Sequence, residues 1–257
     1  MEMSGYASVD KPWLKFYSDE ALSAILPEGS AYDYMYENNR NRLDSYALDY
    51  FGRKVTYREL FARIDETERG FLALGIMPGE IITMAVTNTP EAVFCFYAAN
   101  KIGAVSNMID LRSSAEEFRT LLNEMGGHIA VILDTCSESI AQIINETGIE
   151  KVIVMSPYNS LPFPLSLKKA KLPDDPKFLE WKAFLNLGKG QADFIKYSAA
   201  GDDIAVIAHT GGTTGIPKGV EITNNSLNCV AQEYMRYTVP VRSRRSQQLG
   251  KLCRAQG

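Results

Sequence analysis

Residues 209–220 read His-Thr-Gly-Gly-Thr-Thr-Gly-Ile-Pro-Lys-Gly-Val, and the rest of the chain is best interpreted outward from this stretch. Three glycines, three threonines and one lysine stand between Thr210 and Lys218. Glycine lets the backbone turn its N–H groups toward an anion and approach it closely. Threonine hydroxyls donate further hydrogen bonds, and lysine adds a point charge. The composition therefore predicts a loop that binds a triphosphate or pyrophosphate.

The residues on either side of this loop favour two strands. An apolar run, Ile204–Ala208, precedes it, and a short β-like segment, Gly219–Ile222, follows it. A Walker loop needs a second glycine five residues after the first, but Ile216 stands five residues after Gly211. The dinucleotide fingerprint Gly-x-Gly-x-x-Gly is also absent from the stretch. The alternative to a phosphate loop is a surface turn rich in glycine and threonine.

Composition narrows the class of protein. The chain has 257 residues, 46% of them hydrophobic, which is enough for a sizeable core. A net charge of −4 gives no overall preference for nucleic acid, so no nucleic-acid partner is expected. Met1–Pro12 carries charges and no long apolar run, and the apolar patch Ala92–Ala99 is too short to cross a bilayer, so neither a signal peptide nor a transmembrane segment is predicted.

The cysteines and histidines point away from a metal framework. There are two histidines, and the metal ligands stay unassigned. The four cysteines lack Cys-x-x-Cys spacing, which favours a reducing, cytoplasmic location. They are Cys95, Cys136, Cys229 and Cys253.

From residue 46 onward, strand-like and helix-like segments alternate. A hairpin is predicted to turn at Phe51-Gly52-Arg53, and Thr56 to cap the next helix with Glu59 completing a capping box. Strands are expected at 81–86, 104–108, 129–133 and 152–155, and helices at 92–102, from 114 and at 137–147. Such βαβ units predict an α/β fold, with a mainly parallel sheet covered by helices on both faces. The apolar helix 92–102 should be sandwiched.

Outside this alternation, four segments are interpreted separately. A helix is expected around Ser30–Arg42, where Tyr32, Tyr34 and Tyr36 cover a hydrophobic surface. Residues 156–176 hold five prolines and a lysine cluster and predict a long surface connection. One short helix is predicted at 178–187, and a further helix at 223–237.

The loop resembles the phosphate loop of the adenylate-forming superfamily, which includes acyl-CoA synthetases, luciferases and the adenylation domains of peptide synthetases. Their pattern is Thr-Ser/Gly-Gly-Thr-Thr-Gly-x-Pro-Lys-Gly, and residues 210–219 match it position by position. Gly211 stands where the pattern allows serine or glycine, and glycine at this position resembles the variant found in fatty-acyl-CoA ligases. Segments with counterparts in the family extend the resemblance from about residue 46 to 236. They are Gly52–Leu60, Leu74–Glu80, Asn88–Glu91 and Lys101–Val105.

The resemblance implies a reaction and a set of binding residues. A carboxylic acid attacks the α-phosphorus of ATP to give an acyl-adenylate and pyrophosphate, and a thiol, usually that of coenzyme A, then takes the acyl group. Magnesium shares the phosphate charge. His209 stands where relatives often carry tyrosine or another large residue, and a packing role is expected rather than proton transfer. The residues expected to hold the β- and γ-phosphates are Thr210, Gly211, Gly212, Thr213, Thr214, Gly215 and Lys218.

The resemblance also implies a division of the chain. Residues 46–237 would be the incomplete N-terminal α/β domain of an adenylate-forming enzyme, preceded by an N-terminal segment at 1–45. Residues 238–257 carry five basic residues and no acidic one, and an unstructured tail is expected. A tail that contacts acidic lipid or RNA, and out-of-frame sequence, stay open as alternatives.

Two hypotheses about function follow. Under the first, the chain is the N-terminal part of an acyl-CoA synthetase-like ligase. No residue in it would be catalytic, and it would be inactive alone, because the family's magnesium-side Thr-Glu motif, ribose-binding aspartate and C-terminal catalytic lysine are not found in it. Under the second, it is a non-catalytic nucleotide-binding or interaction module, or a remnant without activity.

Overall fold

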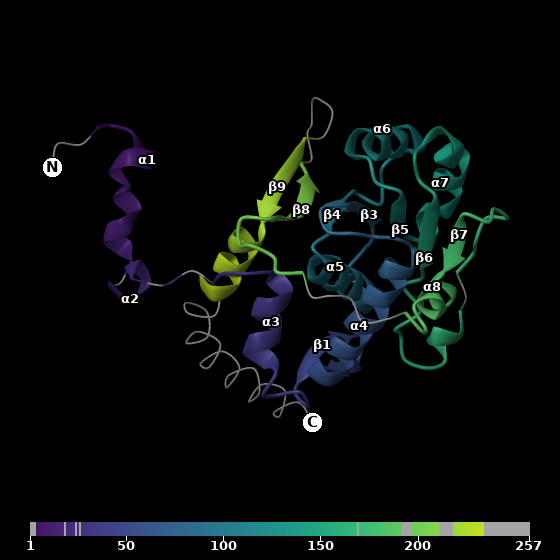
Figure 1. Cartoon of the computed structure of the whole chain (residues 1–257), viewed down its shortest axis with the longest axis horizontal. Coiled ribbons are helices and arrows are strands. Elements are labelled where there is room, and N and C mark those ends of the chain that lie inside the picture. Colours follow the sequence, from purple (N-terminus) through teal and green to yellow (C-terminus); the bar gives the residue numbers. More distant parts are fainter. Residues whose placement is uncertain are drawn as a thin grey trace, which may run out of the picture.

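A computed structural model describes residues 4–17, 19–23, 25, 27–168, 170–191, 197–210 and 218–233. Its centre is a seven-stranded sheet with the strand order β7-β6-β5-β3-β4-β8-β9 (Figure 1). All neighbours are parallel except β8 and β9, which are antiparallel. The strands are β3 (Ile81–Ala85), β4 (Val105–Met108), β5 (Ile129–Leu133), β6 (Lys151–Met155), β7 (Phe178–Glu180), β8 (Ile204–His209) and β9 (Gly219–Thr223). The predicted α/β fold with a mainly parallel sheet is confirmed.

A separate two-stranded hairpin precedes the sheet. Its strands are β1 (Tyr46–Tyr50) and β2 (Arg53–Thr56), and they pair antiparallel as predicted. Gly52 takes a φ of 88° in the turn, where its Cβ-free backbone is well suited to a left-handed conformation.

Helices cover both faces of the large sheet. One core lies beneath α4 (Tyr57–Ala73), α5 (Pro90–Ile102) and α8 (Trp181–Leu187), and the other lies beneath α6 (Ala115–Met125) and α7 (Ser137–Ile143). Neighbouring residues of one strand enter different cores, as Val131 and Ile132 of β5 do. This alternation is the two-residue period of a strand that is buried on both faces.

Shorter elements complete the described chain. The N-terminal helices are α1 (Ala7–Asp10), α2 (Asp19–Leu22) and α3 (Ala31–Asn39), and residues 224–233 are helical after β9. The prediction of a helix around Ser30–Arg42 is confirmed by α3. Single 3-10 turns lie at Pro12–Phe16, Asp134–Cys136, Ile144–Glu146 and Leu165–Leu167.

The first turns of α6 and α4 are capped differently. At α6, Ser114 and Glu117 form the complete capping box. At α4, Thr56 accepts the backbone N–H of Glu59, but the Glu59 carboxylate pairs with Arg53 at 3.2 Å. The prediction of a box at α4 is therefore half right, because the hairpin supplies a charged partner that competes for the glutamate.

Two predicted helices are shorter than expected. Residues 178–180 form strand β7, so the expected helix over 178–187 begins only at Trp181. The open edge of β6 explains this, since Val152 and Ile153 pair with Phe178 and Leu179. Helix α7 ends at Ile143, and a 3-10 turn replaces its expected last turn.

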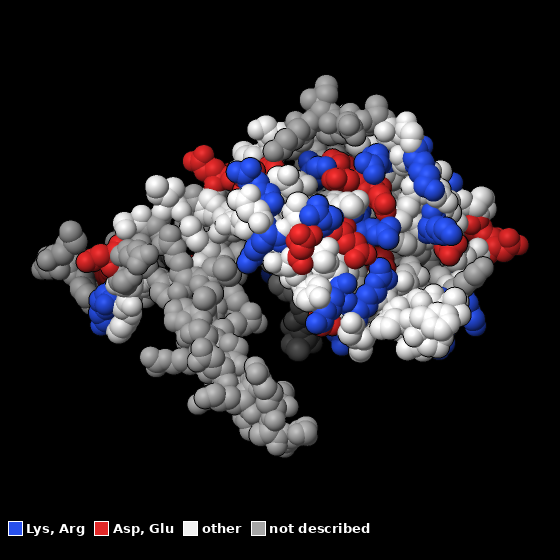
Figure 2. Space-filling model, turned by 90° about the horizontal axis from the view of Figure 1, so that it is seen from below, with Lys and Arg blue, Asp and Glu red and all other residues white. Residues whose placement is uncertain are grey.

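The described surface mixes charges of both signs. The face seen in Figure 2 carries Lys and Arg among Asp and Glu rather than one large patch of a single sign. Within the described ranges, no helix is both long enough and apolar enough to cross a membrane.

Candidate nucleotide-binding site

The strands on either side of the predicted loop form a closed hairpin. His209 of β8 lies opposite Gly219 of β9 in the last pair of the ladder. Beyond it, the Thr210 N–H donates to the Lys218 carbonyl at 3.0 Å, and the Lys218 N–H donates to Thr210 Oγ1 at 3.3 Å. These two bonds hold both ends of the loop at one place.

The structure therefore brings together two of the seven predicted site residues. Thr210 and Lys218 are both exposed at the base of the loop. Thr210 accepts one bond through Oγ1 and keeps its hydroxyl hydrogen to donate. The other five lie outside the described residues, and their role stays a prediction: Gly211, Gly212, Thr213, Thr214 and Gly215.

The hairpin stands at the carboxyl edge of the parallel strands. β8 pairs in parallel with β4, with Ala208 opposite Met108, so the chain enters the loop at the edge where α/β sheets bind their ligands. The loop's location thus agrees with its predicted use.

A buried polar chain crosses the sheet toward the hairpin, and sequence reasoning missed it. Asn107 of β4 donates from Nδ2 to Thr83 Oγ1 at 3.1 Å, and its Oδ1 lies 2.8 Å from His209 Nε2. Asn107 is fully buried, and Thr83 is nearly so. The signal in the sequence was the pair Ser-Asn inside the otherwise apolar strand 104–108.

His209 is thus held by a hydrogen bond and not by packing alone. Burial lowers the pKa of His209, against the opposing charge of Glu124. The lowered pKa favours the neutral ring at neutral pH. Its Nδ1 is buried and has no hydrogen-bond partner among the described residues.

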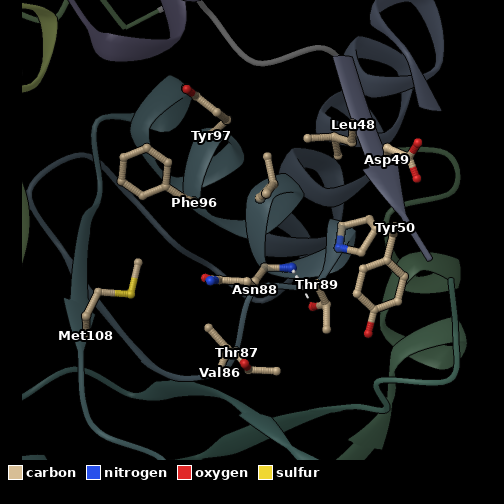
Figure 3. Close-up of a pocket in the computed structure, with 13 residues that line it drawn as sticks. Leu48, Asp49, Tyr50, Val86, Thr87, Asn88, Thr89, Phe96, Tyr97 and Met108 are labelled. Atoms are coloured by element: carbon tan, nitrogen blue, oxygen red, sulfur yellow. Dashed lines mark hydrogen bonds between the residues drawn. The ribbon is translucent and has the colours of Figure 1, made fainter. Parts of the chain in front are cut away.

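A largely apolar cavity of about 450 Å³ lies at the same edge of the sheet (Figure 3). Phe96 and Tyr97 of α5, Tyr50 of β1 and Met108 of β4 lie around it. Helix α5 packs against α4, α3 and β4, in agreement with the expectation of a sandwiched helix, but the face with Phe96 and Tyr97 is only half-buried. Met108 pairs with Ala208, so the cavity lies near the start of the loop.

No metal site is visible in the part of the chain that the structure describes. Among these residues, no group of three or more His, Cys, Asp or Glu side chains is arranged to hold a metal ion. The described residues therefore assign no magnesium ligand.

These features define an α/β protein with a candidate phosphate loop at the carboxyl edge of its sheet. A family model described as "AMP-binding enzyme" matches residues 35–249, and the chain belongs to this family. The resemblance to adenylate-forming enzymes is confirmed.

The relatives are acyl-CoA or aryl-CoA ligases. A long-chain-fatty-acid–CoA ligase of Bacillus subtilis (strain 168) is 22% identical over 84% of this chain and 40% of its own length. 4-Coumarate–CoA ligase 3 of Arabidopsis thaliana is 27% identical over 71% of this chain and 29% of its own. A crotonobetaine/carnitine–CoA ligase of Proteus mirabilis (strain HI4320) is 29% identical over 68% of this chain and 32% of its own length. The chain thus spans two-fifths or less of each of these relatives.

Solved structures support the fold. An anthranilate CoA ligase in complex with anthranoyl-AMP matches with a TM-score of 0.67 at 18% identity, over 84% of this chain and 38% of its own. A benzoate CoA ligase from Burkholderia xenovorans LB400 matches with a TM-score of 0.63 at 21% identity, over 81% and 37%.

Proposed function

We propose that this chain supplies the polyphosphate-binding part of an ATP-dependent, carboxylate-activating ligase of the acyl-CoA synthetase type. The single observation that carries the proposal is the closed hairpin at the carboxyl edge, whose loop matches the family's phosphate loop. The family match and the CoA ligase names of the relatives support it.

The loop's task would be electrostatic. As pyrophosphate leaves the α-phosphorus of ATP, charge develops on its oxygens, and preorganised donors are worth most where charge develops. Thr210 and Lys218 stand at the loop base to contribute a hydroxyl and an ammonium group. The family resemblance adds the amides and hydroxyls of residues 211–215, a magnesium ion and coenzyme A as the acyl acceptor.

The acid is proposed only as a class. The named relatives act on long-chain fatty acids, 4-coumarate and crotonobetaine or carnitine. The proposed substrate is therefore a small-molecule carboxylic acid. The scattered cysteines favour a reducing compartment, and we propose the cytoplasm as the site of the reaction.

A second candidate function is nucleotide binding without catalysis. It would need only the loop, whose base at Thr210 and Lys218 is closed by two hydrogen bonds. Acid-dependent exchange of labelled pyrophosphate into ATP, measured on the 257-residue chain, separates the two. We expect background exchange from this chain alone; exchange that Lys218→Ala abolishes would show that the chain is itself a complete adenylating unit.

The ligase proposal is tested by measuring the two half-reactions separately in this chain joined to the complementary part of a matching ligase. Lys218→Ala should slow adenylation by about ten- to a hundredfold, because it removes a contact that strengthens as pyrophosphate leaves. Transfer from a supplied acyl-adenylate should change little, since pyrophosphate has already gone. Equal losses in both half-reactions would contradict the phosphate role.

A further inference from the structure

We propose that His209 is a positioning residue of the candidate phosphate loop, fixed by Asn107 and Thr83 so that Thr210 and Lys218 are held ready for polyphosphate. The inference rests on the proposed function and adds a residue and a mechanism to it. It stands on the hydrogen bonds and packing of described residues alone.

The first step concerns why Asn107 lies in the sheet. A buried polar side chain is costly unless its hydrogen bonds are made, and Asn107 has no exposed surface. Its side chain is satisfied on one side by Thr83 and on the other by His209. The amide therefore acts as a link across three strands, from β3 through β4 to β8.

The second step concerns the state of the ring. Because Asn107 Nδ2 donates to Thr83, its Oδ1 is the atom that faces His209 Nε2. An oxygen that only accepts requires that Nε2 carry the proton. The lowered pKa of His209 agrees with a neutral ring, whose Nδ1 then holds a lone pair. The ring is thereby fixed in one tautomer and one orientation.

The third step connects the ring to both ends of the loop. His209 is the last residue of β8 and directly precedes Thr210. A Cβ built on Gly219 would lie 3.0 Å from Ile207 Cγ2 and 3.5 Å from His209 Cε1, so the ring lies close over the residue that follows Lys218. The ring of His209 thus lies beside Gly219 of β9, at the point where the loop leaves both strands.

The variants His209→Gln and His209→Leu distinguish the contribution of the hydrogen bond to Asn107 from that of side-chain packing. The amide nitrogen of glutamine reaches about as far as imidazole Nε2 and keeps a donor for Asn107, whereas leucine fills similar space without one. The measurement is equilibrium binding of ATP and of inorganic pyrophosphate to the 257-residue chain, with the thermal unfolding midpoint as the control for folding. Pyrophosphate tests the loop without the ribose and adenine, for which this chain lacks the family's ribose-binding aspartate.

His209→Leu should weaken the binding of ATP and of pyrophosphate by about tenfold, as expected for the loss of one positioning hydrogen bond. His209→Gln should stay within about threefold of the natural chain for both ligands. An unchanged affinity for ATP and pyrophosphate in His209→Leu, or an equal loss in the Gln and Leu variants, would overturn the proposal.

A spectroscopic measurement on the unmutated chain keeps the test independent of folding in the variants. Only two histidines occur, and His128→Gln assigns the ring signals. The ¹⁵N shifts of His209 should show a proton on Nε2 and a bare Nδ1 at neutral pH. A proton on Nδ1, or a charged ring, would overturn the inference.

Failure of this inference differs from failure of the proposed function. If Lys218→Ala leaves ATP affinity unchanged, the phosphate role itself is wrong. If Lys218→Ala weakens ATP binding but His209→Leu does not, only the positioning role of His209 is wrong.

Discussion

Strands β5 and β9 belong to one sheet and differ in almost everything that affects stability. Every residue of β5 is buried, whereas the first three of β9 are exposed. β5 lies between β3 and β6 with helices over both faces, and β9 pairs only with β8. The difference teaches that burial in the middle of the sheet stabilises the fold, while the candidate site lies at the hairpin of β8 and the outermost strand, β9.

This separation has a physical reason. A loop that must approach a ligand needs open backbone and exposed side chains, so it gains little from burial. An exposed edge strand contributes few apolar contacts, and Val220 of β9 keeps 46% of its surface exposed. Substitutions in the middle should therefore change stability, and substitutions at the edge should change binding.

The largest effect is expected from Ile132→Ala in β5, because Ile132 is almost completely buried. Removing its methyl and methylene groups should lower the free energy of unfolding by about 2–5 kcal/mol. Val220→Ala in β9 should cost less than about 0.5 kcal/mol. Urea unfolding measures both, and similar losses would break the comparison.

A smaller loss of stability is expected from a substitution where α5 packs against α4. Lys101 Nζ lies 2.8 Å from Asp65 and 2.5 Å from Glu68, whose side chain is 11% exposed. Lys101→Met would leave a largely buried carboxylate unpaired, and we expect a loss of about 1–3 kcal/mol, below the cost for a fully buried pair.

The matched control is Arg58→Met, which removes the partner of Asp44 from a pair with exposed side chains and should cost at most about 1 kcal/mol. Burial raises the pKa of Glu68, so its protonation at acid pH should reduce the loss in the Lys101 variant. A loss that grows toward acid pH would contradict this account.

The smallest change in the free energy of unfolding is expected at Glu91, in the first turn of α5. Ser160 donates to its Oε1 at 2.5 Å, and its Oε2 is buried with no hydrogen-bond partner in the described part of the chain. Burial raises the pKa of Glu91, so the folded state binds the proton more tightly than the unfolded state. The stability from this group is present below the unfolded pKa and is lost as pH rises through the folded pKa.

Glu91→Gln should therefore match or exceed the natural chain at pH 8, by up to about 1 kcal/mol, and lose that advantage near pH 4. Thermal unfolding across this range is the measurement. Glu66→Gln, at a half-exposed partner of Arg63, is the control and should show no such crossing. An advantage of the Glu91 variant that is largest at acid pH would reverse the assigned sign.

Local signals predicted most of the fold. The cap at Thr56 and the apolar runs that became β3 to β6 depend on residues near one another in sequence. The hairpin around the loop was equally clear, because strand-like segments border a glycine-rich turn on both sides.

What sequence reasoning missed depends on distant partners. β7 is a strand only because β6 offers a free edge. Asn107 and His209 are 102 residues apart, and Glu91 and Ser160 are 69 apart, so no local pattern reports their contacts. Of the candidate site, the loop was predictable from its motif, and the polar chain beneath it was not.

The most direct test of the central claim is calorimetric binding of ATP and of inorganic pyrophosphate to the chain carrying Lys218→Ala, with a substitution of the exposed Lys189, Lys189→Ala, as control. Loss of a charge-assisted contact should weaken ATP binding by about ten- to a hundredfold. Pyrophosphate binding should weaken by a similar factor, the unfolding midpoint should stay unchanged, and the control should behave like the natural chain. Unchanged ATP affinity in Lys218→Ala, or an equal loss in Lys189→Ala, would contradict a phosphate site at the exposed edge.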